Sequence, residues 1–364
     1  MGFSEFHGNA EVITRLREML VRDRFPHAVI LAGPEGAGKY TLAQMLAKAM
    51  NCLSPPKGEL PDFCGACANC TRIAQADDLT ARFEEAVEAR EALKESEKKD
   101  TPLLVQTHPD VLVIPPDPPQ LLIKIGQVRR VIGTIYYRPG DAREKVMIFT
   151  CADFMKEAAN SLLKVLEEPP EFATIFLLAE NAGALLPTIR SRAVTFTLGA
   201  LKTDEIEQYL AENRRELAPK ARALVARLSG GAIGKAKTFD LGAYTESRKD
   251  ALVLLGTAIA GEDHTSLFRT TESYRAGAEG AQKTDALLRA TYSLLEDLLF
   301  LKSGTAELVR NADIAGELGK MAARVEFDWI ATAAQRLGEV ESGMRRNLLR
   351  SLSLDAFATS LEPA

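Results

Sequence analysis

Short, mostly apolar runs alternate along the first 200 residues with segments in which apolar residues recur at helical spacing. Residues 11–22 and 41–50 show the helical spacing, and they flank an apolar run typical of a buried strand. The predicted strands cover residues 28–32, 111–114, 146–149, 174–178 and 194–196. Strands that alternate with helices in this way predict an α/β fold, with a parallel sheet covered by helices on both faces.

The pattern changes beyond about residue 200, where the strand signals end. Residues 204–217, 221–228 and 285–302 all show helical spacing. Glycines between residues 230 and 234 interrupt the first helical group, which is typical of a domain edge. The remainder, from about residue 240, predicts a separate helical bundle without a catalytic constellation.

Composition is typical of a globular protein. The chain has 364 residues, of which 46% are hydrophobic and 26% charged, and this predicts two or three domains. The formal net charge of −5 excludes a bulk basic field that would draw the chain to nucleic acid. Apolar runs stop at about five residues, short of the ~20 that cross a bilayer, and the first residues do not resemble a signal peptide. We therefore expect a cytoplasmic protein.

Residues 77–100 form a highly charged stretch, with nine acidic and five basic side chains among 24 residues. Leu79, Phe83 and Val87 recur every four residues, which is compatible with a thinly amphipathic helix. A solvated insertion with no chemistry of its own is the favoured interpretation.

Residues 33–40 read GPEGAGKY and follow the first predicted strand. They match a Walker A phosphate loop at every signature position except the last, which should be Ser or Thr. That hydroxyl coordinates the Mg²⁺ bridging the β- and γ-phosphates, a role that a tyrosine cannot fill. The residues that would surround a phosphate are Gly33, Gly36, Gly38, Lys39, Tyr40 and Thr41, the last lying about 100° too far round the helix. The loop is either an anion cradle or an empty inherited feature, and we do not expect hydrolysis.

The predicted strand at residues 146–149 lacks the second catalytic element. Walker B chemistry needs a carboxylate at the end of such a strand to hold Mg²⁺, usually with a second acid to position water. Thr150 and Cys151 occupy those two places. Asp153 could serve only in a shifted strand register. Both departures argue against ATP hydrolysis.

Four of the five cysteines fall in one loop-rich stretch: Cys52, Cys64, Cys67 and Cys70. In a reducing compartment such a cluster indicates a metal site rather than disulfides. Four thiolates supply a closed tetrahedral site for structural zinc, which is the interpretation we favour. The Cys-x₂-Cys-x₂-Cys run leaves an iron–sulfur cluster open, as well as free thiols, and Cys52 is the least secure ligand because a long gap precedes the triplet. A metal here would staple a small insertion that lacks its own core.

Two segments before the last predicted strand complete the candidate chemistry. Residues 160–170 predict an amphipathic helix that a diproline ends. Arg190 and Arg192 then precede the strand at 194–196. The rigid fork of an arginine suits it to reach the phosphates of a neighbouring subunit as an arginine finger, and a solvent-facing arginine is the alternative.

Taken together, these motifs resemble the delta-prime family of subunits of the bacterial DNA polymerase III clamp loader. The resemblance extends from Gly8 to about Lys235 and is weaker beyond. Besides the loop, the cysteines and the predicted helix before the diproline, its carriers are residues 25–28 (FPHA), 108–110 (HPD), 125–129 (IGQVR) and 191–192 (SR). Each motif is modest, whereas their order and combination are specific.

The resemblance implies a fold of three parts. An AAA+ P-loop module would cover residues 1–198, a small helical lid 199–240 and an all-α collar, used for oligomerisation, 241–364. A zinc-binding insertion at 51–72 and a charged helical insertion at 73–107 would interrupt the first module.

The resemblance also implies a role within an assembly. Such a subunit does not hydrolyse ATP, stands as a rigid stator beside the delta subunit, and donates an arginine to the ATP site of the adjacent tau/gamma subunit. The family's Ser-Arg-Cys motif falls on residues 191–193, which makes Arg192 the implied finger, and its zinc ligands fall on Cys52, Cys64, Cys67 and Cys70. The complete assembly, part of the DNA polymerase III holoenzyme, loads the sliding clamp on primed DNA.

Several positions depart from the family pattern. Ala193 replaces the motif's cysteine, Glu180 stands near the sensor threonine of active relatives, and Lys235 lies where they carry a sensor arginine. An active tau/gamma-type ATPase is the alternative, although it predicts a Walker A hydroxyl and an acid pair. A DNA-binding zinc protein would need a basic surface near the cysteines, where only Arg72 follows closely.

Overall fold

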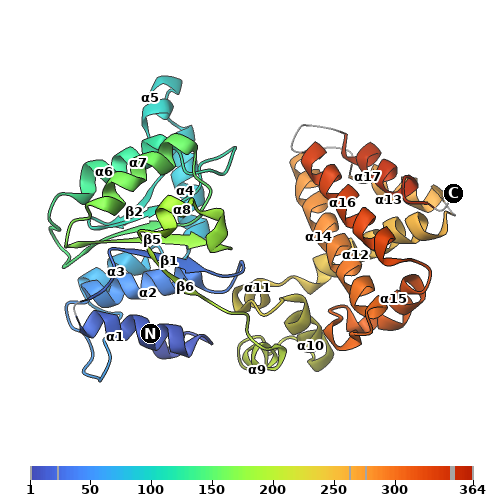
Figure 1. The fold of residues 1–364 in the computed structure, drawn as a ribbon, viewed down its shortest axis with the longest axis horizontal. Helices are drawn as coiled ribbons and strands as arrows, with labels where there is room; N and C mark the ends of the chain where they lie inside the picture. Colours follow the sequence, from blue (N-terminus) through green and yellow to red (C-terminus); the bar gives the residue numbers. More distant parts are fainter. Residues whose placement is uncertain (1, 23, 262–263, 275–276, 345–348, 363–364) are drawn as a thin grey trace. The chain divides into compact units, whose positions relative to one another are not determined.

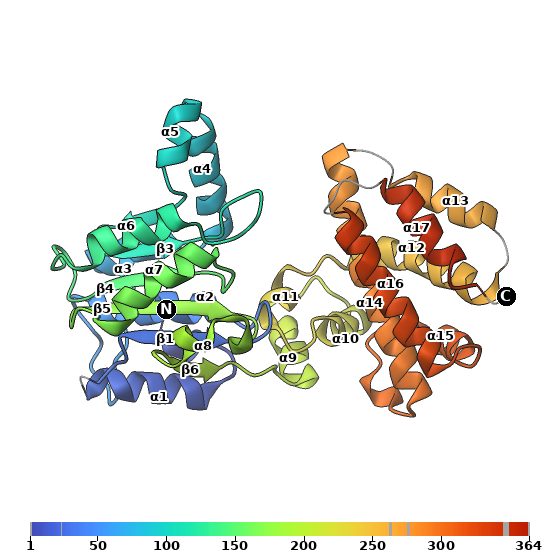
Figure 2. The ribbon, with the colours of Figure 1, turned by 45° about the horizontal axis from the view of Figure 1, so that its top comes forward.

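The computed structural model describes residues 2–22, 24–261, 264–274, 277–344 and 349–362. The chain divides into two compact units (Figures 1 and 2). The first comprises Met1–Leu201 and Gly231–Lys235, and the second comprises Lys202–Gly230 and Ala236–Ala364. Residues of the predicted lid thus occur in both units, and the division into a lid and a collar stays a prediction.

The first unit is built on a six-stranded sheet with the strand order β2-β3-β4-β5-β1-β6. Its strands are β1 (Ala28–Ala32), β2 (Val105–His108), β3 (Val111–Ile114), β4 (Lys145–Phe149), β5 (Ala173–Ala179) and β6 (Val194–Thr197). All neighbouring strands are parallel except β2, which pairs antiparallel with β3 at one edge. The predicted parallel sheet is confirmed, and its five predicted strands match to within one residue at each end. β2 was not predicted, because three of the four residues in its sequence VQTH are polar.

Helices cover both faces of this sheet (Figures 1 and 2). One face carries α1 (Ala10–Val21), α2 (Lys39–Asn51) and α3 (Ala68–Ala74), and the other carries α6 (Ile125–Ile135), α7 (Lys156–Glu167) and α8 (Pro187–Arg190). Successive strand residues enter opposite cores, with Val29 and Leu31 on the first face and Ile30 on the second. The four inner strands, β1, β3, β4 and β5, are therefore buried on both faces, which explains why they read as nearly continuous apolar runs.

The charged stretch at 77–100 folds as two helices, α4 (Leu79–Glu91) and α5 (Glu95–Asp100), which extend beyond the sheet (Figure 2). No residue of α4 is fully buried. A buried ion-pair group ties α4 to the loop between β3 and α6, because Asp117 lies 2.7 Å from Arg90 Nη1 and 2.9 Å from Lys124 Nζ. The insertion is thus a solvated element that is fixed at one side.

The motif at residues 108–110 forms the turn between β2 and β3, and both of its polar side chains are buried. The Asp110 carboxylate accepts hydrogen bonds from the backbone N–H groups of residues 140–142, at 2.9 to 3.3 Å. His108 Nδ1 accepts a hydrogen bond from the Asp110 N–H at 3.1 Å, and burial lowers the pKa of His108. The motif therefore secures the loop before β4, at the sheet end opposite the phosphate loop.

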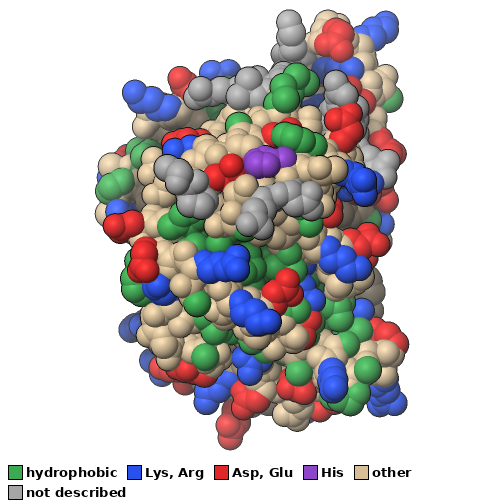
Figure 3. All heavy atoms as spheres, turned by 90° about the vertical axis from the view of Figure 1, so that its right-hand side faces the viewer, with side chains coloured by type: hydrophobic (Ala, Val, Ile, Leu, Met, Phe, Trp, Pro, Cys, Tyr) green, Lys and Arg blue, Asp and Glu red, His purple; other side chains and the backbone are tan. Residues whose placement is uncertain are grey.

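The second unit is helical over its described residues. Its helices are α9 (Thr203–Asn213), α10 (Pro219–Leu228), α11 (Ile233–Thr238, shared with the first unit), α12 (Leu241–Ala260), α13 (His264–Glu272), α14 (Gly277–Lys302), α15 (Ala315–Ala322), α16 (Phe327–Met344) and α17 (Arg350–Thr359). α9 ends four residues before the prediction, and α14 begins eight residues earlier. Figure 3 shows a face of this unit on which acidic, basic and hydrophobic side chains are interspersed. Within the described ranges, none of the helices combines the length and apolarity needed to cross a membrane.

Candidate functional site

The phosphate loop connects β1 to α2, in the strand–loop–helix context that the motif requires. Gly36 and Gly38 have φ of +79° and +88°, a left-handed backbone that glycine adopts without strain. Lys39 is the first residue of α2, and its Nζ donates hydrogen bonds to the backbone oxygens of Gly33 at 2.6 Å and Pro34 at 2.8 Å. The lysine ammonium is therefore bonded to the loop's own carbonyl groups.

Residues 231–235 lie directly against this loop. The Gly234 N–H donates to the Gly36 oxygen at 2.8 Å, and Lys235 Nζ lies 3.2 Å from the Glu35 carboxylate. A Cβ on Gly36 would come within 2.9 Å of Lys235, so this close approach requires glycine. Lys235, the predicted counterpart of a sensor arginine, is thus paired with an acid of the loop itself.

The charges around Lys39 have mixed signs. Burial lowers the pKa of Lys39, the carboxylates of Glu180 and Glu35 oppose that shift, and Lys235 adds to it. Glu180 directly follows β5, at the same sheet end as the loop. Its negative charge disfavours a phosphate in this place.

Tyr40 stands where a Walker A loop has its metal-binding hydroxyl, and its own hydroxyl is engaged elsewhere. Tyr40 Oη donates a hydrogen bond to the Ala76 oxygen at 2.5 Å and accepts one from Gln44 Nε2 at 2.7 Å. Burial raises the pKa of Tyr40, an effect that the Gln44 bond opposes. Lys48, two turns further along α2, adds an ion pair with Asp77 at 2.7 Å. Because Ala76 and Asp77 follow α3, these contacts tie α2 to the cysteine-rich insertion.

The end of β4 carries no carboxylate in the two positions after the strand. Thr150 and Cys151 follow Phe149, and burial raises the pKa of the Cys151 thiol to about 11. β4 pairs with β3 and β5 in continuous register up to Phe149. Asp153 therefore lies four residues beyond the strand, and no register shift brings it to the strand end.

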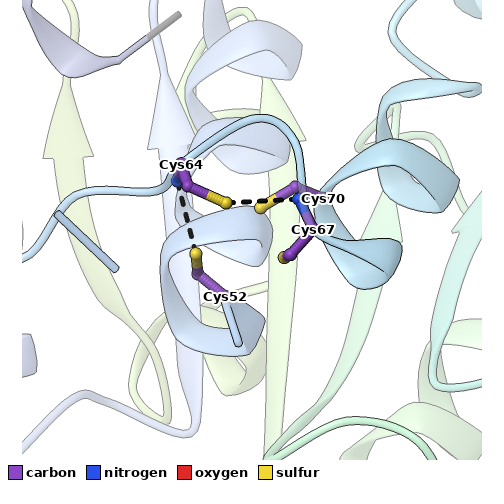
Figure 4. Close-up of side chains that lie close together, drawn as sticks. All are labelled: Cys52, Cys64, Cys67 and Cys70. Atoms are coloured by element: carbon purple, nitrogen blue, oxygen red, sulfur yellow. Dashed lines mark hydrogen bonds between the residues drawn. The ribbon is translucent and has the colours of Figure 1, made fainter. Parts of the chain in front are cut away.

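The four predicted metal ligands lie together, with their sulfur atoms within 4.8 Å of one another (Figure 4). Cys52 directly follows α2, Cys64 and Cys67 lie in the loop, and Cys70 is in α3. A tetrahedral ion with thiolates at about 2.3 Å holds its sulfur atoms about 3.8 Å apart, which this cluster can meet with small movements. Cys52, the ligand that the sequence predicted with the least support, is part of the cluster.

Backbone N–H groups point at the sulfur atoms of Cys52, Cys64 and Cys67 and favour their thiolate forms, whereas burial raises the pKa of Cys52 and Cys70. The Cys64 N–H lies 3.3 Å from Cys52 Sγ, and the Ala66 and Cys67 N–H groups lie 3.4 and 3.2 Å from Cys64 Sγ, which lowers the pKa of Cys64. Burial raises the pKa of Cys67, but hydrogen bonds from the backbone N–H groups of Cys70 and Leu53 and from the side chains of Cys70 and Cys64 outweigh it and lower the pKa to about 6. The donor set and its environment are suited to hold a metal ion.

Arg192 lies at the sheet end opposite the phosphate loop. β6 runs parallel to β1, and Val194 pairs with Val29 near the start of β1, whereas the loop follows the end of β1. About 15 Å of strand therefore separates the arginine from its own loop. The exposed guanidinium is held by Glu167 Oε1, 2.7 Å from Nη2, and by the Thr188 oxygen, 3.0 Å from Nη1.

Sequence patterns did not predict the partners of these groups. Tyr40 and Ala76 lie 36 positions apart, Arg90 and Asp117 27 positions, and Glu167 and Arg192 25 positions. Periodicity and spacing report local structure, so they carry no signal for such pairs. The cysteine cluster is the exception, because the spacing of three of its members was itself the signal.

The strand order, the glycine loop and the helical second unit define the class of the protein as a P-loop α/β module linked to a helical region. Comparison of sequences identifies the family. The profile described as "DNA polymerase III, delta subunit" matches residues 8–202, more than half of the chain. The chain belongs to this family of DNA polymerase III clamp-loader subunits.

The curated relatives include subunits of two types. The chain is 27% identical over 341 residues to the tau subunit of Escherichia coli, which covers 92% of this chain and 42% of that subunit. It is 28% identical over 258 residues to the delta-prime subunit of Bacillus subtilis, covering 71% and 67% of the two chains. It is 30% identical over 174 residues to the delta-prime subunit of Pseudomonas aeruginosa, covering 48% and 43%. The chain thus spans less than half of the tau subunit, and identity does not separate the two types.

Solved structures of similar proteins include a DNA polymerase III gamma subunit-related protein from Thermotoga maritima. It has a TM-score of 0.42 and 17% identity, with 96% of this chain and 99% of that chain covered. The RuvB Holliday junction branch migration motor of the same organism has a TM-score of 0.38 and 17% identity, with 88% of each chain covered.

Proposed function

We propose that this chain is a non-hydrolysing subunit of the clamp loader, of the delta-prime type. Its partners would be the delta and tau/gamma subunits, and through the assembly it would support ATP-dependent loading of the sliding clamp on primed DNA. The observation that carries the proposal is the state of the chain's own phosphate loop. The Tyr40 hydroxyl is bonded to Ala76, and the Lys39 ammonium is bonded to Gly33 and Pro34. In this arrangement the Tyr40 hydroxyl is not available to a Mg²⁺ ion, and two of the three N–H donors of Lys39 are engaged.

An active tau/gamma-type ATPase is the second candidate, and the identity to the tau subunit over 92% of this chain favours it. Hydrolysis by such an enzyme requires a hydroxyl and a carboxylate for Mg²⁺. The Tyr40 hydroxyl is bonded to Ala76, Thr150 offers no carboxylate, and the acidic Glu180 near Lys39 opposes the γ-phosphate. The first candidate therefore agrees better with the chemistry of the site.

A DNA-binding zinc protein is the least supported alternative. It needs a basic surface beside the cysteines, and Arg72 is the basic residue closest in sequence to the cluster. Arg72 Nη1 lies 2.9 Å from an Asp141 carboxylate oxygen, so its charge is already paired.

Arg192 is proposed as the arginine finger that this chain supplies to a neighbouring subunit. Its place at the sheet end opposite its own loop supports action in trans, because about 15 Å of strand keeps it from a phosphate bound in its own chain. A finger stabilises the charge that develops during phosphoryl transfer, and in well-studied GTPases it contributes ~10³–10⁵ in rate.

The cysteine cluster is proposed to hold a structural zinc ion. All four ligand positions would be filled by thiolates, so the ion would have no open position for catalysis. It would fold the insertion that precedes Ala76 and Asp77, and thereby support the contacts that these residues make with α2.

Reconstitution of a loader tests the proposal. The chain is expected to co-purify with delta and tau/gamma subunits, and Arg192→Ala is expected to assemble normally. The total ATPase rate of that assembly should fall by the amount that the one ATP site served by Arg192 contributes. Arg190→Ala is the matched control, since Arg190 is also exposed and lies two residues earlier. An assembly whose ATPase is unchanged by Arg192→Ala would overturn the finger assignment.

A further inference from the structure

The guanidinium of Arg192 is engaged with acceptors of its own chain. Nη2 donates a hydrogen bond to Glu167 Oε1 at 2.7 Å, and Nη1 donates to the Thr188 oxygen at 3.0 Å and to Ser191 Oγ at 3.3 Å. The side chains of Arg192 and Glu167 are 34% and 50% exposed, so this pair lies at the surface. Glu167 is the last residue of α7, whose Leu162 side chain is fully buried under the sheet.

We propose that Glu167 is a positioning residue for Arg192. It holds the guanidinium in a resting position and competes with a nucleotide phosphate of a neighbouring subunit for the same N–H donors. This inference rests on the proposed role of Arg192 as an arginine finger.

The Glu167 carboxylate and a nucleotide phosphate would compete for the guanidinium of Arg192. Carboxylate and phosphate oxygens both bind the planar N–H donors of a guanidinium, and the bonds to Glu167, Thr188 and Ser191 already involve both terminal nitrogens. Glu167 is fixed by a packed helix, whereas Arg192 has a long side chain on a surface turn. Exchange therefore consists of the arginine swinging from the carboxylate to the phosphate.

The strength of the pair suits such an exchange. An exposed ion pair shifts an equilibrium by no more than about fivefold. A nucleotide phosphate can displace a carboxylate that is held this weakly. Loss of the ion pair would still change the ATPase rate by a measurable factor. Removal of the carboxylate charge should make Arg192 more available to the neighbour and raise the rate rather than lower it.

The first test uses Glu167→Gln in the reconstituted loader, because the amide keeps the shape and removes the charge. We expect kcat/KM for ATP at the site served by Arg192 to rise about two- to fivefold. In the background of Arg192→Ala, Glu167→Gln should have no effect, since there is then no finger to release. Glu168→Gln is the matched control, because the recorded contact of Glu168 with Tyr136 uses its backbone oxygen. An unchanged or lower kcat/KM in Glu167→Gln would overturn the proposal.

The second test needs no partner subunit. Phenylglyoxal modifies accessible guanidinium groups, and mass spectrometry of the isolated chain gives its rate at Arg192 relative to Arg190. Glu167→Gln should accelerate modification of Arg192 about two- to fivefold, with the thermal unfolding midpoint unchanged. An equal rate in both proteins would show that Glu167 does not hold Arg192. If Arg192→Ala leaves the loader's ATPase intact, the proposed finger role of Arg192 fails, and this second test still decides by itself whether Glu167 holds Arg192.

Discussion

The hydroxyl of Tyr40 offers a direct test of what replaced the Walker A side chain. Tyr40→Phe removes one oxygen atom and with it two hydrogen bonds, to the Ala76 oxygen and from Gln44 Nε2. Gln44 is 1% exposed, so water does not readily replace the lost partner. Each bond contributes about 0.5–1.5 kcal/mol net, and a buried group left without a partner costs more, so we expect the first unit to lose about 2 kcal/mol.

Hydrogen exchange resolves this loss within the first unit. The amides of β1 lie in a fully buried strand that pairs with β5 on one side and β6 on the other, so they exchange only when that unit opens broadly. A loss of about 2 kcal/mol corresponds to about 30-fold faster exchange, since 1.4 kcal/mol is a factor of ten.

Tyr137→Phe is the matched control for this substitution. Tyr137 is 71% exposed, so loss of its hydroxyl should change the free energy of unfolding by less than about 0.5 kcal/mol. If Tyr40→Phe exchanges no faster than Tyr137→Phe, the Tyr40 hydroxyl does not tie α2 to the insertion, and our explanation of the degenerate loop is wrong.

Two further predictions concern the metal and pH. The purified chain should contain about one zinc ion per molecule. Cys70→Ser should lose this ion, whereas Cys151→Ser, which lies outside the cluster, should keep it. Iron in place of zinc, or equal metal content in the two variants, would contradict the proposed zinc site. Burial lowers the pKa of His108 in the folded chain, so the unfolded chain binds a proton at this residue first as pH falls. The stability that the neutral, buried His108 contributes is therefore fully present above pH 6.5 and is lost as pH falls toward the folded pKa. Replacement of His108 by Asn, unlike that of the exposed His27, should therefore reduce the loss of stability between pH 7 and pH 5; equal slopes in urea unfolding would refute this.

The sequence predicted the central strands well because those strands are buried on both faces and read as apolar runs. β2 escaped prediction because an edge strand needs little apolar surface, and only two of its four residues are buried. The break between α4 and α5 also escaped, since neither glycine nor proline marks residues 92–94.

At the candidate site, the chemistry of the residues was predictable and their partners were not. The GPEGAGKY motif and the cysteine spacing each specify a local backbone arrangement. The engagement of Arg192 by Glu167 and of Tyr40 by Ala76 depends on which elements the sheet brings together. A single sequence holds no periodic signal for such contacts.

The most direct test of the central claim is Mg²⁺-dependent release of phosphate from ATP by the purified chain alone. Lys39→Ala serves as the background, because it removes the one lysine of the phosphate loop and leaves any contaminating ATPase unaffected. We predict that the unmodified chain and Lys39→Ala release phosphate at the same background rate. A turnover that the unmodified chain shows and Lys39→Ala loses would contradict the account and favour an active motor subunit.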